Sequence, residues 1–230
     1  MEQLFGQLSL IIHIIAGAST LIAGPIAIFY NFKNVKNHRL AGKVFFYAML
    51  VVVVTSWMGY VKRPDQVFFQ FLLGIAMIVL AGTLRGVRAI QFMKNKSRPG
   101  GLDFGYTLLL GLFGMWMSGK AFWHFEQGTM IAFPILFAVF GGSALADTIK
   151  NLRLFLHPER VERMTWYRLH VSTMLGAFTA STTAFTVNAA TFLPWYLQWF
   201  GPTLLIVPLQ FYFGRKLKRQ QKPAAAAQAA

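Results

Sequence analysis

The chain alternates long apolar segments with short basic clusters, and this alternation restricts its fold more than any other feature. A helix needs about 20 residues to cross the hydrocarbon core of a bilayer, and seven segments are long enough. They lie near 7–30, 44–61, 67–90, 104–123, 129–150, 169–190 and 193–213. Backbone groups inside a bilayer have no water to bond, so such segments must be helical. The sequence therefore predicts an all-α membrane protein, a seven-transmembrane-helix bundle.

Basic residues indicate how this bundle is oriented. Of the 22 Lys and Arg residues, 19 lie beside or after the first, third, fifth and seventh segments. The positive-inside rule assigns that side to the cytoplasm. We therefore expect an outside N-terminus and a multi-pass protein of a cytoplasmic membrane. Residues 1–214 would form the transmembrane domain, and 215–230 a basic and then Ala-rich cytoplasmic tail.

Composition excludes several classes of protein. A chain that is 56% hydrophobic and only 13% charged lies outside the usual range of water-soluble domains. The net charge of +15 would suggest nucleic acid in a soluble protein, but here the basic residues sit in orientation clusters. We therefore expect the lipid bilayer, and no nucleic acid, as the partner. The absence of cysteine excludes disulfides, thiolate nucleophiles and Cys-ligated metal sites.

Small and polar residues follow one face of the first expected helix and one face of the sixth. The first face carries His13, Gly17, Thr20 and Gly24; the sixth carries His170, Thr173, Ala177, Ser181, Ala184 and Asn188. Small residues let helices approach closely, so both faces fit packing seams. Alternatively, they line a polar site for a small ligand or a proton-linked path, with His13, His170, Ser181 and Asn188 as candidates.

Asp147 is the one carboxylate well inside an expected span, and a buried ionisable group is a functional candidate by default. Arg85 or Arg168 could pair with it, and a salt bridge that fixes helix register explains it equally well. A second hypothesis joins Asp147 to basic and aromatic residues at the cytoplasmic side, in a pocket for an anionic lipid head group or a quinone. Its candidate residues are His38, Arg39, Lys43, Arg168 and His170.

The histidines allow a haem hypothesis. Two axial ligands must lie at one depth on facing helices, which favours the pairs His13 with His124 and His38 with His170. The di-haem pattern of two histidines on one span is absent, and no zinc motif occurs. Because the two histidine pairs remain possible, a b-type haem is kept as an alternative. Nucleotide loops and catalytic triads are also missing from the sequence, which favours a non-enzymatic protein.

Three groups of short motifs are distinctive: the stretch from His13 to Gly24-Pro25, then His38-Arg39-Leu-Ala-Gly-Lys43, and Leu169-His170-Val-Ser-Thr-Met with Leu193-Pro194. Together they resemble a bacterial family of predicted integral membrane proteins, domain of unknown function 2306. The resemblance covers the first, second, sixth and seventh segments. The family has no established activity, so the resemblance implies a bacterial origin and marks these positions for testing.

Three functions are compatible with these observations. The first is an integral membrane protein with a polar intramembrane site on the first and sixth helices. The second is a membrane redox protein that binds b-type haem or a quinone. The third is a structural or regulatory membrane subunit, because no charged pathway crosses the expected bilayer centre.

Overall fold

The computed structural model describes residues 2–95, 97–128 and 131–228 of the chain, and side chains for 6–95, 97–128 and 131–215. These residues form seven α-helices, the short 3₁₀ helix Pro158–Arg160, and no strand. The α-helices are α1 (Glu2–Tyr30), α2 (Val35–Lys62), α3 (Val67–Met93), α4 (Gly101–Glu126), α5 (Ala132–Leu156), α6 (Arg163–Ala189) and α7 (Trp195–Gln228). The all-helical fold with seven helices, predicted from the apolar segments, is confirmed.

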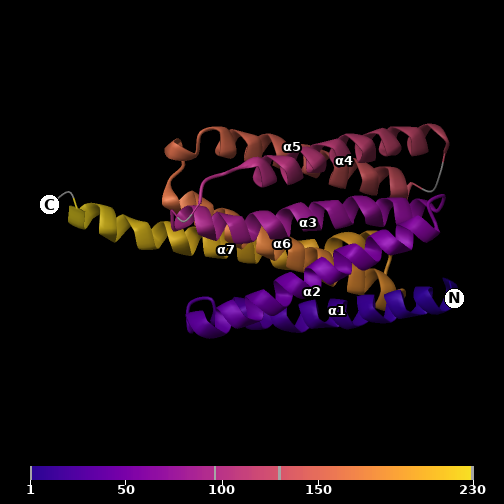
Figure 1. The fold of residues 1–230 in the computed structure, drawn as a ribbon, viewed down its shortest axis with the longest axis horizontal. Helices are drawn as coiled ribbons and strands as arrows, with labels where there is room; N and C mark the ends of the chain where they lie inside the picture. The colour runs from indigo at the N-terminus through magenta and orange to yellow at the C-terminus, as the bar shows by residue number, and fades with distance from the viewer. Residues whose placement is uncertain (1, 96, 129–130, 229–230) are drawn as a thin grey trace.

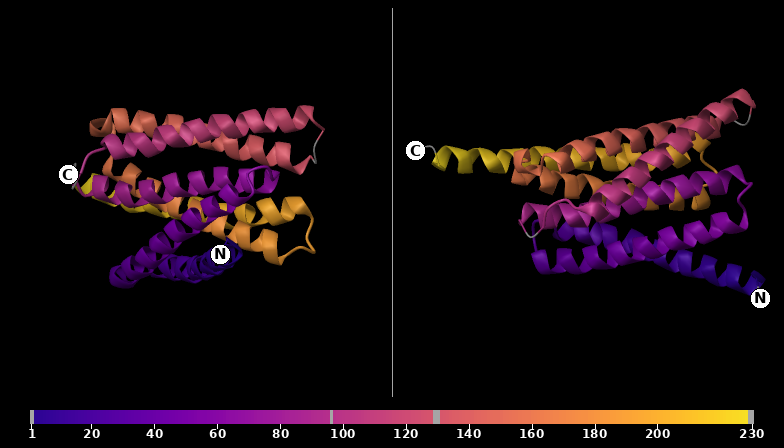
Figure 2. Two further views of the ribbon diagram at one scale, coloured as in Figure 1. Left: turned by 45° about the vertical axis from the view of Figure 1, so that its right-hand side comes forward. Right: turned by 45° about the horizontal axis from the view of Figure 1, so that its top comes forward.

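Consecutive helices run antiparallel, so their connections collect at two ends of the bundle (Figure 1). The α1–α2, α3–α4 and α5–α6 connections lie at one end with the C-terminus, here called the basic end. The other connections lie with the start of α1, at the N-terminal end. The hairpin α1–α2 lies on one side of α3 and the hairpin α4–α5 on the other, while α6 packs along α3 (Figure 2). Helix α3 is therefore the centre of the bundle.

Within the part of the chain that the structure describes, four helical segments are long and apolar enough to cross a membrane: Gly6–Tyr30, Val35–Lys62, Val67–Met93 and Ala132–Leu156. Large apolar side chains also cover the outside of the bundle. Ile15, Ile22 and Leu204 are 62%, 64% and 69% exposed. Water-soluble proteins seldom expose contiguous apolar surface on this scale. Both features are those of a membrane protein.

Four helices, α1, α2, α4 and α6, begin earlier than the apolar segments predict, and the difference is largest for α2 and α6. Helix α2 starts at Val35 rather than near residue 44, because the side chain of Asn34 accepts the N–H groups of Lys36 and Asn37 at 3.0 and 3.1 Å. The segment around His38, expected as a turn, therefore forms the first turns of α2. Helix α6 starts at Arg163 rather than near 169, and α7 continues past 213 to Gln228, through most of the expected tail.

Glycines bring α4 and α5 into close contact. A Cβ atom added at Gly141 would lie 2.9 Å from the backbone nitrogen of Ser118, and one at Gly114 would lie 3.1 Å from that of Leu145. Only glycine permits these backbones to approach so closely. The α4–α5 hairpin is consequently a closely packed unit, in contrast to the open space on the other side of α3.

Candidate functional site: a chamber between the helices

A large chamber separates α1 and α2 from α6, with α3 as its floor and parts of α5 and α7 completing the wall. Its volume is about 2170 Å³, well above the roughly 300–1,000 Å³ of ordinary small-molecule pockets. The lining residues of α3 run from Phe68 to Arg85, about 25 Å along the helix axis. The chamber therefore extends along most of the bundle.

Gly82 shows that the chamber reaches into the interior of the fold. The residue is buried in α3 and lines the chamber, yet a Cβ atom added to it would meet nothing within 4 Å. Gly17 on α1 also lines the chamber with open space beside it. Gly86, one turn further along α3, differs because its Cβ would lie 2.4 Å from Met174. Tight packing thus resumes directly beyond the chamber.

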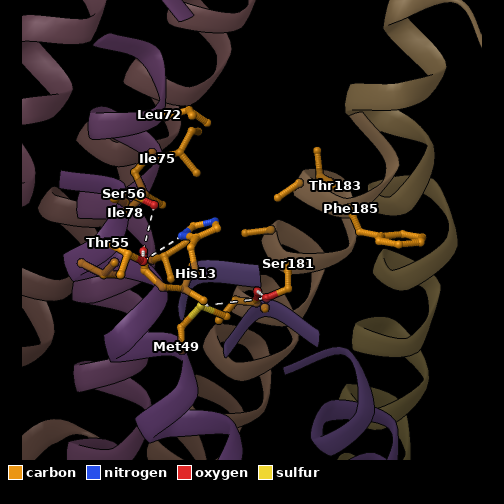
Figure 3. A pocket seen from close by; sticks show the side chains of 18 of the residues that line it. His13, Met49, Thr55, Ser56, Leu72, Ile75, Ile78, Ser181, Thr183 and Phe185 are labelled. Atoms are coloured by element: carbon orange, nitrogen blue, oxygen red, sulfur yellow. Dashed lines mark hydrogen bonds between the residues drawn. The ribbon is translucent and has the colours of Figure 1, made fainter. Parts of the chain in front are cut away.

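A polar cluster lies in the part of the chamber nearer the N-terminal end (Figure 3). The hydroxyl of Thr55 donates to the carbonyl of Val51 at 2.7 Å, and the Nδ1 atom of His13 lies 2.8 Å from the same hydroxyl oxygen. Since the hydroxyl proton is already used, the His13 Nδ1–H donates to Thr55. The Nε2 atom of a neutral His13 is then a hydrogen-bond acceptor for the chamber.

The expected faces of α1 and α6 meet around this space. Thr20 on α1 is fully buried and donates to the Ser181 hydroxyl on α6 at 3.1 Å, so part of each face is a packing seam. His13, Ser181 and Asn188 nevertheless all line the chamber. Figure 3 shows His13 on one side of the open space, with Ser181 and Thr183 on the other. The structure thus brings three of the candidate residues to one cavity.

An ion pair lies toward the basic end of the chamber. The Nη2 atom of Arg85 on α3 donates to Oδ2 of Asp147 on α5 at 2.7 Å, and both residues line the chamber. Arg85 is therefore the partner of Asp147. The Arg85 side chain is 4% exposed, whereas that of Asp147 is 43% exposed. The pair joins a buried cation to a carboxylate that is half open to its surroundings.

Two of the remaining candidates, His38 and His170, lie together at the basic end, while Arg168 is partly buried on α6. The Nδ1–H of His38 donates to the Ala27 carbonyl at 2.9 Å, and that of His170 donates to the Gly86 carbonyl at 2.8 Å. Their ring centroids are 6.3 Å apart, and Tyr167 stacks on His170 at the same separation. Neither histidine lines the chamber. The pocket expected here does not include Asp147, which is bonded to α3, and Arg39 and Lys43 are exposed.

His124 does not join His13. It is buried on α4, where its ring stacks on Phe137 of α5 at 5.6 Å. His13 is on α1, on the opposite side of α3 (Figure 1). The expected outer histidine pair is therefore wrong, whereas the inner pair, His38 and His170, is brought together.

Several important residues were not among the sequence candidates. Thr55 and Ser56 line the chamber, but they look like ordinary small residues of an apolar segment. Asp103 is fully buried, although it precedes the expected fourth span; it accepts two hydrogen bonds from Arg88 at 2.9 and 2.7 Å, and one from the Tyr106 hydroxyl. The Asp103-x-x-Tyr106 spacing places both side chains on one helix face, which is the only sequence signal for this network.

No protein-family model, no curated protein and no solved structure matches the chain. The class that the fold defines is an all-helical bundle with several apolar helices and a large chamber between them.

Proposed function

We propose that this is a non-enzymatic, multi-pass protein of the bacterial cytoplasmic membrane whose chamber binds a small, largely apolar ligand. In this proposal all seven helices cross the bilayer, with the N-terminus outside and the C-terminus in the cytoplasm. The antiparallel order of the helices supports this topology, as do the four strongly apolar helices and the concentration of Lys and Arg at the basic end.

The chamber itself carries the proposal. An interior that served only for packing would be filled close to crystal density, with few voids larger than a water molecule. Here about 2170 Å³ is open, between helices that pack closely elsewhere. Polar side chains such as His13 and Thr55 lie beside apolar residues such as Ile75 and Ile78 (Figure 3). The Arg85–Asp147 ion pair lines the chamber further along α3. This pattern suits a lipophilic molecule with polar groups that fix its orientation.

Filling the chamber tests this function. Gly82→Leu places a side chain in the open space, and Gly142→Leu is the matched control because Gly142 is exposed on α5, outside the chamber, with nothing within 4 Å of its Cβ. We expect Gly82→Leu to reduce binding of a fluorescent lipophile, dansyl-undecanoic acid, to protein in phosphatidylcholine nanodiscs at least about tenfold, as for a ligand excluded by steric overlap. Gly142→Leu should bind like the parent. Equal binding by all three proteins would refute a ligand chamber.

A redox protein is the second candidate, and one observation favours it. Each of His38 and His170 donates its Nδ1–H to a backbone carbonyl, which leaves Nε2 as the ligand atom. Their centroid separation of 6.3 Å is close to the roughly 6 Å expected for two imidazoles on one metal ion. The chamber reaches neither ring, so a haem would require α2 and α6 to separate.

Absorption spectroscopy separates the two candidates. Haem bound by this pair gives a Soret band that shifts on reduction and is lost in both His38→Ala and His170→Ala. Protein purified from cells supplied with a haem precursor, yet without a Soret band, would exclude haem binding by this pair. The result leaves the chamber proposal untouched, because the histidine pair lies outside the chamber.

A further inference from the structure

Arg85 has more hydrogen-bond donors than the surrounding protein satisfies. Its Nη2 atom bonds Asp147 at 2.7 Å, but Nε and Nη1 are buried and have no acceptor among the residues that the structure describes. A buried charged group without partners is strongly destabilising, and proteins rarely retain one without a role. Arg85 lines the chamber, so a molecule that enters it and displaces the side chains covering these two nitrogens can supply the missing acceptors.

The charge of the chamber specifies the sign of that molecule. Among the described lining residues, four are Lys or Arg and a single one, Asp147, is a carboxylate. The basic residues are Lys62, Arg63, Arg85 and Lys150. This excess favours an anion, and the N–H groups of a guanidinium form charge-assisted hydrogen bonds to the oxygens of a carboxylate or phosphate. A bidentate contact would use Nη2, the atom that Asp147 now holds.

The remainder of the chamber specifies the body of the molecule. From Arg85 the lining continues along α3 through Gly82, Ile78 and Ile75 to Leu72, which presents an apolar surface. We propose that the chamber binds an anionic amphiphile with its carboxylate or phosphate head on Arg85 and its apolar chain along α3. This inference rests on the proposed function and adds the chemical class of the ligand.

Asp147 then has a defined part in binding. Its carboxylate bonds Nη2 of the guanidinium and therefore competes with the ligand head for Arg85. Neutralising Asp147 removes this competitor and should tighten the binding of an anion. A salt bridge that only fixes helix register predicts no change in binding from either residue, so the two explanations differ in a measurable way.

The test uses dansyl-undecanoic acid bound to the full chain in phosphatidylcholine nanodiscs, displaced by laurate, dodecyl phosphate, dodecanol or inorganic phosphate. Arg85→Gln should weaken laurate binding by roughly tenfold to a hundredfold, the loss expected for charge-assisted hydrogen bonds. Dodecanol binding should change little. Arg88→Gln is the matched control, because Arg88 lies on the same helix, also pairs with an aspartate at 2.7 Å, and does not line the chamber. It should bind laurate like the parent.

Two further variants keep the test decisive if Arg85→Gln does not fold. Arg85→Lys retains the charge without the fork and should weaken laurate binding, while Asp147→Asn should strengthen it. If laurate alone displaces the probe, the ligand has a carboxylate head; if dodecyl phosphate alone does so, it has a phosphate head. If inorganic phosphate displaces the probe, the site needs no apolar chain, and the proposal of an amphiphilic ligand is overturned.

The failures of the two proposals are distinguishable. If neither laurate nor dodecanol binds and Gly82→Leu changes nothing, the chamber binds no lipophile and both proposals fall. If both compounds bind, Gly82→Leu blocks them, and Arg85→Gln leaves laurate unaffected, the chamber function stands and the anion site is refuted.

Discussion

Two arginines on adjacent turns of α3 have opposite environments. Arg88 is 24% exposed, and its carboxylate partner Asp103 is completely buried. Arg85 is 4% exposed, and its partner Asp147 is half open. Asp103 accepts from Arg88, from the Tyr106 hydroxyl and from the Gly100 N–H, so its charge is fully compensated. The Arg88–Asp103 pair is therefore structural, whereas the incompletely paired Arg85 is suited to a ligand.

Replacing Asp103 should cost more stability than the same change at Asp147. Asp103→Asn removes a fully buried charge that accepts hydrogen bonds from three donor groups, which costs about 2–4 kcal/mol. The apparent melting temperature, followed by tryptophan fluorescence in detergent, should fall by roughly 5–15 °C. Asp147→Asn is the matched control and should lower it less, because that carboxylate is 43% exposed. The opposite ranking would contradict a structural role for Asp103.

At this scale the sequence identifies candidates but not their partners. His13, Ser181 and Asn188 could be found because helical spacing places them on two faces that meet. The Arg85–Asp147 pair could be proposed, but not chosen over Arg168, since the choice depends on how α3, α5 and α6 are rotated against one another. The unsatisfied donors of Arg85 have no sequence signal, because they depend on which groups the neighbouring helices place around the guanidinium.

The element with the closest packing is the α4–α5 hairpin, and two neighbouring glycines of α5 have opposite surroundings. Gly141 faces the backbone of α4, with Ser118 only 2.9 Å from an added Cβ. Gly142 is exposed, and nothing lies within 4 Å of its Cβ. One methyl group therefore tests whether this interface is as close as described.

Gly141→Ala should destabilise the protein by about 1–3 kcal/mol, because the backbone of α4 must move to admit the methyl group. Gly142→Ala should be neutral or stabilising by up to about 1 kcal/mol, since alanine favours a helix more than glycine does. Fluorescence-detected thermal unfolding of both variants in the same detergent measures the difference. Equal melting temperatures would show that α4 and α5 are further apart than described.

Helix boundaries show why segments are easier to predict than their ends. The apolar runs located all seven helices, because hydrophobicity is summed over many residues. The start of α2 depends instead on one cap, Asn34, which precedes a polar turn that hydropathy reads as a loop. That one cap moves His38 onto a helix and so fixes its position beside His170.

At the scale of the whole molecule, the proposed topology assigns each end of the bundle to one side of the membrane. The chain has no cysteine, so an introduced one is the only thiol available for labelling. In intact cells, a membrane-impermeant maleimide should label Asp65→Cys and Gln127→Cys, which lie in exposed connections of the N-terminal end. Arg160→Cys, exposed at the basic end, should react only after permeabilisation. The reverse pattern would invert the topology, and labelling of all three would refute it.

More of the helical architecture than of the chamber could be predicted from the sequence. Alternating apolar segments and basic clusters indicate seven antiparallel helices, because each is a property of one segment. The chamber, in contrast, exists because the packed helices leave a volume unfilled. It depends on the side-chain sizes of α1, α2, α3 and α6 taken together. Gly82 illustrates this, since from the sequence a glycine in an apolar helix suggests close helix packing as readily as open space.

The sequence distance between the partners of each ion pair also determines the order in which the two pairs can form. Arg88 and Asp103 are 15 residues apart, whereas Arg85 and Asp147 are 62 apart. At about 5–20 residues per second, a ribosome makes the first partner within roughly 1–3 s but the second only after roughly 3–12 s. During biosynthesis α3 is joined to α4 first, and Arg85 waits without its carboxylate until α5 is made. The wall of the chamber at Arg85 is thus completed after α3 and α4 are joined, but before α6 and α7, which also line the chamber, have been made.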